Sequence, residues 1–142
     1  MPQTLEFKQS SHLDPQLYDP AAISANVEKL TGRWLNTNRE TRGIAECVIE
    51  PDGPDLIVKV IATGVEGPIA WPTMRAAVLA NLEEEAGQRT AALAVNFEFG
   101  FMKSETYIRI NKGVLVIVLF NSFLDGSGRS NYVTREFFNR AD

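Results

Sequence analysis

The sequence of 142 residues contains one cysteine and one histidine, and these two scarcities exclude several kinds of chemistry. A single cysteine, Cys47, cannot form a disulfide within the chain or build a thiolate zinc site. The single histidine, His12, has no metal-ligand partner or catalytic neighbour at a suitable spacing, so no Ser-His-Asp set can be assembled around it. We therefore expect no metal and no cofactor, with His12 exposed to solvent and Cys47 packed as a small apolar side chain.

Basic clusters and long apolar runs are also missing. The net charge is −4 and no two Lys or Arg residues are adjacent, so we expect no nucleic-acid partner. The longest unbroken apolar run, residues 114–120, is far shorter than the roughly 20 residues that a membrane helix needs. The first residues show no basic segment followed by an apolar core, so we expect a cytoplasmic protein without a membrane span.

What the second half of the chain has in abundance is short apolar runs separated by turns. Runs at 91–99, 102–110 and 114–123 follow one another with almost nothing between them, and a run at 131–139 follows the glycine-containing loop 124–130. Strands joined this tightly run antiparallel, because a parallel return needs a crossover of about a dozen residues or more. The pattern predicts an antiparallel meander.

The first half of the chain extends this meander. Residues 1–20 carry three prolines and are predicted to form an irregular arm ahead of a single domain over 21–142. A short helix is expected over 21–30, at the start of that domain. After the helix we expect strands over 31–37, 43–50 and 56–63, and then a loop over 64–72 around Trp71.

Residues 73–82 fit either a helix or a strand. Their alanines suit a helix, but a strand continues the meander between the hairpins on both sides, and we predict a strand. Counting it, the chain has eight antiparallel strands, which is what an all-β, up-and-down β-barrel requires. The interior of such a barrel is either filled by side chains or holds one small ligand.

The residues at the two ends of the barrel resemble a known superfamily. A short helix leading into Gly32-x-Trp34, followed by a meander with an arginine on its last strand, resembles the calycins, which include lipocalins and fatty-acid-binding proteins. The resemblance implies a ligand-binding barrel, with Trp34 across the base and either Arg135 or Arg140 packed over its ring. The stretches 34–37, 41–44 and 125–132 look like a smaller lipocalin-like group of unassigned function.

Strand alternation also sorts the loops between the two ends. Loops 38–42, 64–72, 100–101 and 124–130 share one end, and the short turns 51–55, 83–88 and 111–113 share the other. The first end carries Trp71, Arg39, Arg42 and Arg129, so a mouth there is mildly basic. This favours a ligand with an anionic end, such as a fatty acid or a carboxylated polyketide; the alternative is that these arginines are simply solvated.

Period-two alternation assigns the faces of two strands. In 91–99 and 102–110 the apolar sets face the lumen, and Glu98, Glu105 and Arg109 face outward; an inverted assignment would bury Glu98 and Arg109. The predicted ligand-binding residues are Trp71, Phe97, Phe99, Phe120, Tyr132, Arg42 and Arg129. Val95 and Val118 are also predicted to face the lumen.

The run 114–123 is apolar on both faces, so one face points out of the barrel. An exposed apolar stripe of that size is unusual on a monomer. We expect either the N-terminal arm or a second copy of the chain to cover it, the latter giving a homodimer through the outer face of 114–123.

Three functions are compatible with this sequence. The first is binding of a small apolar or amphipathic, possibly anionic, molecule inside the barrel. The second is an enzyme that cyclises or isomerises a hydrophobic substrate by confinement, which needs no charged triad. The third is a structural homodimer with a filled core. No catalytic residue is assigned, and binding is favoured.

Overall fold

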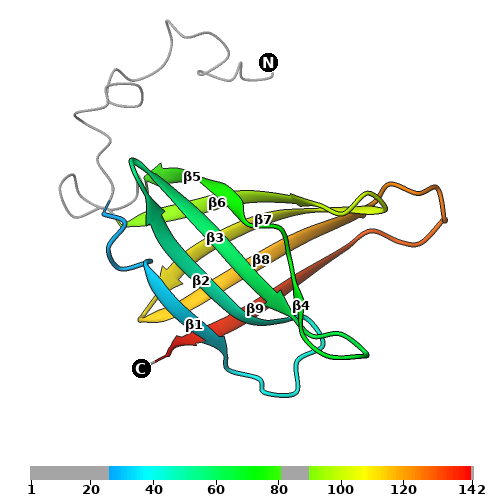
Figure 1. The fold of residues 1–142 in the computed structure, drawn as a ribbon, viewed down its shortest axis with the longest axis horizontal. Coiled ribbons are helices and arrows are strands. Elements are labelled where there is room, and N and C mark those ends of the chain that lie inside the picture. The colour runs from blue at the N-terminus through cyan, green and yellow to red at the C-terminus, as the bar shows by residue number, and fades with distance from the viewer. Residues whose placement is uncertain (1–25, 81–89, 142) are drawn as a thin grey trace, which may run out of the picture.

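The structure is a computed structural model that describes residues 26–80 and 90–141 (Figure 1). Within these ranges it is all-β and contains no helix. The strands, in chain order, are β1 (Gly32–Asn36), β2 (Ile44–Asp52), β3 (Asp55–Ala62), β4 (Ile69–Ala70), β5 (Met74–Ala80), β6 (Ala91–Glu98), β7 (Met102–Asn111), β8 (Val114–Phe123) and β9 (Tyr132–Arg140).

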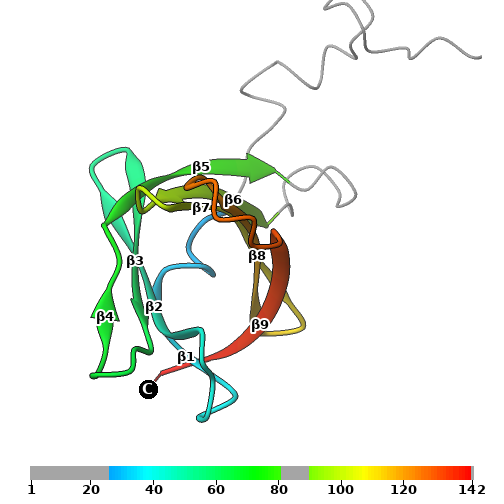
Figure 2. The same cartoon turned by 90° about the vertical axis from the view of Figure 1, so that its right-hand side faces the viewer.

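These strands close into an eight-stranded antiparallel barrel, as the sequence predicts. Sequential strands pair around the ring, and β1 pairs with both β2 and β9, so the last strand returns to the first. Figure 2, a view along the ring, shows this closure. Closure pairs every strand except the two-residue β4 on both sides and leaves no long edge open to other chains.

The fourth position in the ring is filled by two strands, β4 and β5. Both pair with the same side of β3, β4 at Ile61 and Ala62 and β5 at residues 56–58. Residues 71–73 separate them, so one barrel strand is interrupted. The prediction of a strand over 73–82 is confirmed for 74–80. The predicted loop 64–72 is wrong at β4, because the glycines and prolines around this short strand hide its signal in the sequence.

The expected N-terminal helix falls mostly outside the described residues, as do the predicted arm 1–20, His12 and the turn 83–88. Residues 26–30, which the prediction included in the helix, form a turn: the Leu30 amide donates to the Val27 carbonyl at 3.0 Å. Asn26 forms a parallel bridge with Thr90, and the Leu30 side chain is buried in the core. This segment crosses one end of the ring (Figure 2).

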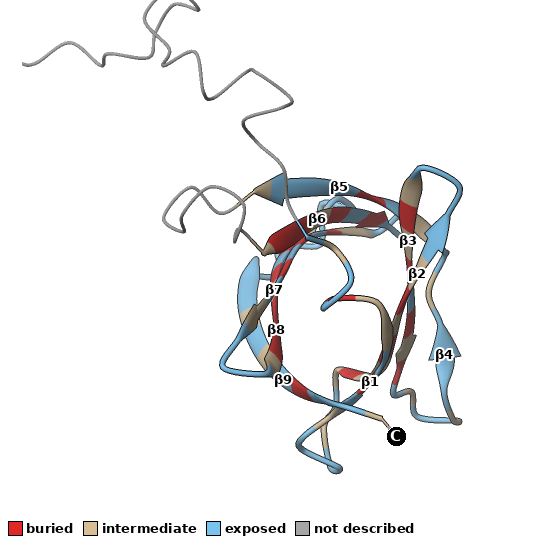
Figure 3. Ribbon diagram, turned by 90° about the vertical axis from the view of Figure 1, so that its left-hand side faces the viewer, coloured by how far each residue is buried: buried red, intermediate tan, exposed pale blue. Residues whose placement is uncertain are grey.

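The interior of the barrel holds a single apolar cluster with members from every long strand. Buried and exposed residues alternate along the strands, as Figure 3 shows in red and pale blue. On β6 and β7 the alternation is the predicted one, with Val95, Phe97 and Ile108 buried and Glu98 and Arg109 exposed. The inverted assignment is therefore wrong.

The assignment of β8 is the reverse of the expected one. Leu115, Ile117 and Leu119 point into the barrel, whereas Phe120 is 51% exposed on its outer face, in the same row as Val118. The expectation that Phe120 and Val118 line the lumen is wrong. Because this run is apolar at both parities, alternation within it contains no information about which face is buried.

Trp34, Gly32 and Arg140 meet at the closed end of the barrel. The Trp34 indole N–H donates to the Leu30 carbonyl at 2.9 Å, and the Arg140 guanidinium lies 4.3 Å above the Trp34 ring. The same guanidinium donates to the carbonyls of Thr31 and Lys29, each at 2.6 Å. Gly32 has a φ of +125°, and a Cβ there would lie 2.6 Å from an Arg140 nitrogen.

Of the two arginines expected over the Trp34 ring, Arg140 occupies the position and Arg135 does not. Arg135 is on the outer face of β9, with its guanidinium 5.5 Å from the Phe137 ring. The register explains this, because Arg135 pairs with the outward-facing Val118.

Replacing Arg140 by lysine tests how much this end contributes. Lysine keeps the charge but loses the planar contact with Trp34 and the fork that bonds two carbonyls, so we expect the free energy of unfolding in urea to fall by about 1–2 kcal/mol. Arg33→Lys is the matched control: Arg33 lies on the outer surface in an exposed ion pair with Glu46, and its loss should cost under about 0.5 kcal/mol. Equal effects of the two changes would contradict this role for Arg140.

Candidate functional site

A pocket of about 620 Å³ opens at the end of the barrel where the sequence predicts the mouth. Loop residues 41–43 and Trp71 contribute, together with residues that directly follow the loops 100–101 and 124–130. The lining residues are Thr41, Arg42, Gly43, Ile44, Ala62, Thr63, Ile69, Trp71, Met102, Leu119, Asn121, Tyr132, Thr134, Arg135 and Glu136.

The two sides of this pocket differ in polarity. The side made by β3, β4 and Trp71 is mainly apolar and includes Ala62 and Ile69. The side made by β8 and β9 carries amide, hydroxyl and carboxylate groups, from Asn121 to Glu136. The pocket therefore suits a molecule with one apolar and one polar face.

Trp71 is positioned by the interruption between β4 and β5. Its amide still donates to the Val60 carbonyl of β3 at 2.9 Å, while the chain breaks from the sheet directly after it. The indole packs edge-on against Phe97 and Phe99, with ring centres 5.0 and 4.9 Å away. Of the predicted aromatic residues, Trp71 lines the pocket, and Phe97, which is fully buried, supports it from below.

Glu136 organises the mouth, and sequence reasoning did not single it out. Its carboxylate accepts hydrogen bonds from the Thr41 hydroxyl at 2.6 Å, the Asn36 amide at 3.0 Å and the Ile44 backbone N–H at 3.2 Å. These three donors come from both sides of the β1–β2 loop, so the carboxylate fixes that loop against β9. Gly43 permits this approach, because a Cβ there would lie 2.7 Å from a carboxylate oxygen.

Three polar side chains are buried inside the barrel, and one of them, Asn121, lines the pocket. Ser104, Thr106 and Asn121 are each at most 5% exposed, inside an otherwise apolar interior. The hydroxyls of Ser104 and Thr106 lie 3.3 Å apart and bond to each other. Asn121 is the cross-strand neighbour of Ser104 on β7 and of Tyr132 on β9. The alternation of β7 predicted the first two as luminal; the two-faced β8 concealed Asn121.

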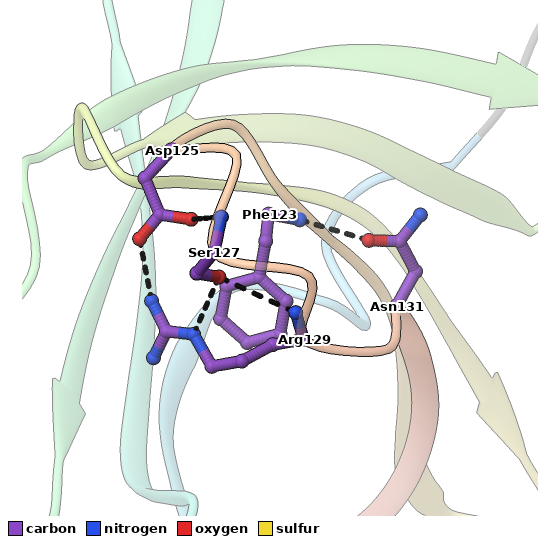
Figure 4. A network of polar contacts seen from close by, with 5 residues as sticks. All are labelled: Phe123, Asp125, Ser127, Arg129 and Asn131. Atoms are coloured by element: carbon purple, nitrogen blue, oxygen red, sulfur yellow. Dashed lines mark hydrogen bonds and ion pairs between the residues drawn. The ribbon is translucent and has the colours of Figure 1, made fainter.

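Arg129, a predicted ligand residue, is bonded within its own loop (Figure 4). Its guanidinium pairs with the Asp125 carboxylate at 2.7 Å, bonds the Ser127 hydroxyl at 3.0 Å and lies 4.1 Å from the Phe123 ring centre. Hydrogen bonds from Ser127 and then Arg129 hold the pKa of Asp125 below its usual value. Arg129 does not line the pocket. Asp125, Ser127 and Arg129, spaced two residues apart, bond to one another and form a self-contained turn rather than a gate.

The remaining predicted residues divide between the pocket and the outer surface. Arg42 lines the pocket and is exposed, with no ion pair among the described residues. Tyr132 also lines it, although 47% of its surface remains exposed. Phe99 packs on Trp71 behind the pocket, and Phe120 is on the opposite side of the barrel wall.

The described residues offer few side chains for nucleophilic catalysis or metal binding. Burial, with a smaller contribution from the Glu46 charge, raises the pKa of the Cys47 thiol to about 12, so the reactive thiolate is not populated at neutral pH. Among the described residues, no three His, Cys, Asp or Glu side chains are grouped as metal ligands. Residues 26–80 and 90–141 include no helix long and apolar enough to cross a membrane.

Comparison with known proteins yields no match: no family model, curated protein or solved structure is significantly similar to this chain. A function for this chain therefore has to be argued from the geometry of the pocket and of its surroundings.

Removing the Glu136 carboxylate tests its role at the mouth. Glu136→Ala leaves three donors without their acceptor, so we expect a loss of about 1–3 kcal/mol in the free energy of unfolding and faster hydrogen exchange at the Ile44 amide. Glu50→Ala, which removes a half-exposed ion pair with Lys59 at 3.0 Å on the neighbouring strands β2 and β3, should cost less than about 0.5 kcal/mol. Unchanged exchange at Ile44 would show that the loop is held by other contacts.

Proposed function

We propose that this protein binds a small amphipathic molecule in the pocket at the mouth of the barrel. The observation that carries this proposal is the pocket itself, whose volume of about 620 Å³ lies within the range of roughly 300–1,000 Å³ typical of ligand sites. Its apolar side, with Trp71 at the centre, fits the body of such a molecule, and its polar side orients it.

The packing below the pocket favours a compact ligand over a long fatty acid. Leu93, Phe97, Ile108 and Ile117 have no measurable exposed surface, and Val95 is 1% exposed. Because no water-sized space touches these side chains, no channel leads from the pocket to the base of the barrel. A long acyl chain entering the mouth would have to displace this core, whereas a one- or two-ring molecule fits above it.

Two arginines line the pocket, and Arg42 is the one available to an anionic group at the rim, because the Arg135 guanidinium lies 5.5 Å from the ring of the exposed Phe137. Arg42 is exposed beside the pocket and unpaired within the described residues, unlike Arg129, which is bound to Asp125. Glu136 carries the opposite charge next to the Arg42 loop, but three hydrogen-bond donors already surround its carboxylate. We infer that a carboxylate on the ligand is tolerated at the rim and modestly favoured there.

Two further parts of the proposal concern ancestry and catalysis. The contact of Arg140 with Trp34, next to Gly32, supports placing the chain among the calycins. Cyclisation or isomerisation by confinement would use the same pocket, and no observation favours it over binding.

Titration with 2-naphthoate, a compact amphipathic anion, tests the proposal. We expect binding with a dissociation constant between about 10 μM and 1 mM, from about 0.3–0.5 kcal/mol for each non-hydrogen atom, and a change in tryptophan emission. The emission change should disappear in Trp71→Phe, because Trp34 is buried at the other end of the barrel. No binding at millimolar concentrations, measured by calorimetry, would overturn the proposal.

The same probe separates the role of Arg42 from binding in general. Arg42→Gln should weaken 2-naphthoate two- to fivefold, roughly the 0.4–1 kcal/mol of an exposed ion pair, and leave the neutral 2-acetylnaphthalene unchanged. Arg39→Gln, in the same loop but outside the pocket lining, is the control. Equal weakening of both ligands would contradict an electrostatic role for Arg42.

A second candidate function, self-association, is favoured by the outer face of β8 and β9. Phe120, Val133 and Phe137, which are 51%, 60% and 41% exposed, form with Tyr107 an outer patch that is apolar except for Arg135, which lies between Val133 and Phe137 on β9. Glu105 and Arg109 flank it on β7. A twofold axis across the strands would place Glu105 opposite the Arg109 of a second copy.

Sedimentation of the full chain tests self-association. We expect a dimer for the wild type and a monomer for Phe120→Lys, because a charge would then be buried in the apolar contact. Phe101→Lys changes an equally exposed aromatic residue at the mouth and should leave the dimer intact. A monomeric wild type would exclude this interface.

A further inference from the structure

Asn121 carries the one buried side-chain polar atom without a hydrogen-bond partner in the described part of the molecule. Its side-chain oxygen Oδ1 is shielded from solvent and accepts no hydrogen bond, and the residue as a whole is 5% exposed. A buried acceptor without a donor costs about 1–3 kcal/mol. Such a group is rare in folded proteins, and its position is informative.

Asn121 lies near the mouth end of β8, two residues before that strand ends. It lines the mouth pocket together with Leu119, on the luminal face of β8. The hydroxyls of its β7 neighbours Ser104 and Thr106 bond to each other and not to this oxygen. Tyr132, its partner on β9, is half exposed. The described residues therefore give this oxygen no donor, and the pocket that Asn121 lines is the space from which a donor can come.

We propose that Asn121 accepts a hydrogen bond from the ligand in the mouth pocket, which identifies the ligand as a compact ring compound with a hydroxyl or N–H group. This inference rests on the proposed function. The donor meets the amide, which turns about its soft terminal torsion to present Oδ1. The apolar body then lies against Trp71 and Ile69, and any ionised group remains near Arg42 at the rim.

The buried acceptor sets the orientation of the ligand. A ligand that placed carbon atoms against Asn121 would leave the acceptor unpaired. A ligand that turns its donor to Asn121 supplies the missing bond, and its apolar body still meets Ile69 and Trp71, which line the same pocket. Sites that offer a polar group to a substrate hydroxyl discriminate strongly against analogues that lack it.

Three matched probes test the inference by calorimetry on the full chain: 2-naphthoate, 6-hydroxy-2-naphthoate and 6-methoxy-2-naphthoate. We expect the hydroxy compound to bind about tenfold more tightly than 2-naphthoate, equivalent to about 1.4 kcal/mol. The methoxy compound, which accepts but cannot donate, should bind no better than 2-naphthoate. This comparison uses only the wild-type protein.

Asn121→Leu adds a test of the residue itself. Leucine has a similar volume and no acceptor, so the tenfold preference should fall to about one while 2-naphthoate still binds. The variant should unfold at the same or a higher urea concentration, because an unpaired polar group is replaced by an apolar one. Ser104→Ala, next to Asn121 but bonded elsewhere, should keep the preference.

The outcomes separate this inference from the proposed function. Equal affinity for the three probes would mean that water satisfies Asn121, and would overturn the inference while binding stands. A preference that survives Asn121→Leu would assign the donor to another group and overturn it as well. Failure of all three probes to bind would overturn the proposed function and the inference with it.

Discussion

The short strand β1 holds the structure together, because it closes the ring. It is only five residues long, yet it pairs with β2 on one side and β9 on the other. Its central side chain, Trp34, is fully enclosed, and Arg140 from β9 lies over the indole while bonding the chain that leads into β1. Backbone pairing and this contact act at the same seam, so closure and the plugging of the base depend on each other.

Closure divides the interior into two unequal parts. At the base, large apolar side chains from all around the ring meet and exclude water. Toward the mouth the interior also carries polar side chains, such as Asn121 and Glu136, and the strand between β3 and β6 is interrupted at residues 71–73. The pocket is what remains where the core ends. A short, wide site of this kind selects compact molecules by shape before any specific bond is made.

The charges of the mouth serve two different purposes. Glu136 and Asp125 each hold a loop: Glu136 fixes the β1–β2 loop, and Asp125 with Arg129 stiffens the β8–β9 loop. The β1–β2 loop lines the pocket through residues 41–43, so its rigidity preserves the shape of the pocket. Arg42 is outside these networks, and Asn121 is buried with an unfilled acceptor. These are the two groups that the proposed ligand engages.

Local sequence determined the strands, their antiparallel order and the end at which the pocket opens, because turn residues and two-residue periodicity are properties of short segments. It also determined the luminal face of β6 and β7, where apolar and polar residues alternate. Only the tertiary structure decided the faces of β8 and β9, since Leu119 and Phe120, like Phe137 and Phe138, are apolar neighbours of opposite parity. Placing Asn121 and Glu136 inside, and Arg140 rather than Arg135 over Trp34, required the register between distant strands, which no single segment encodes.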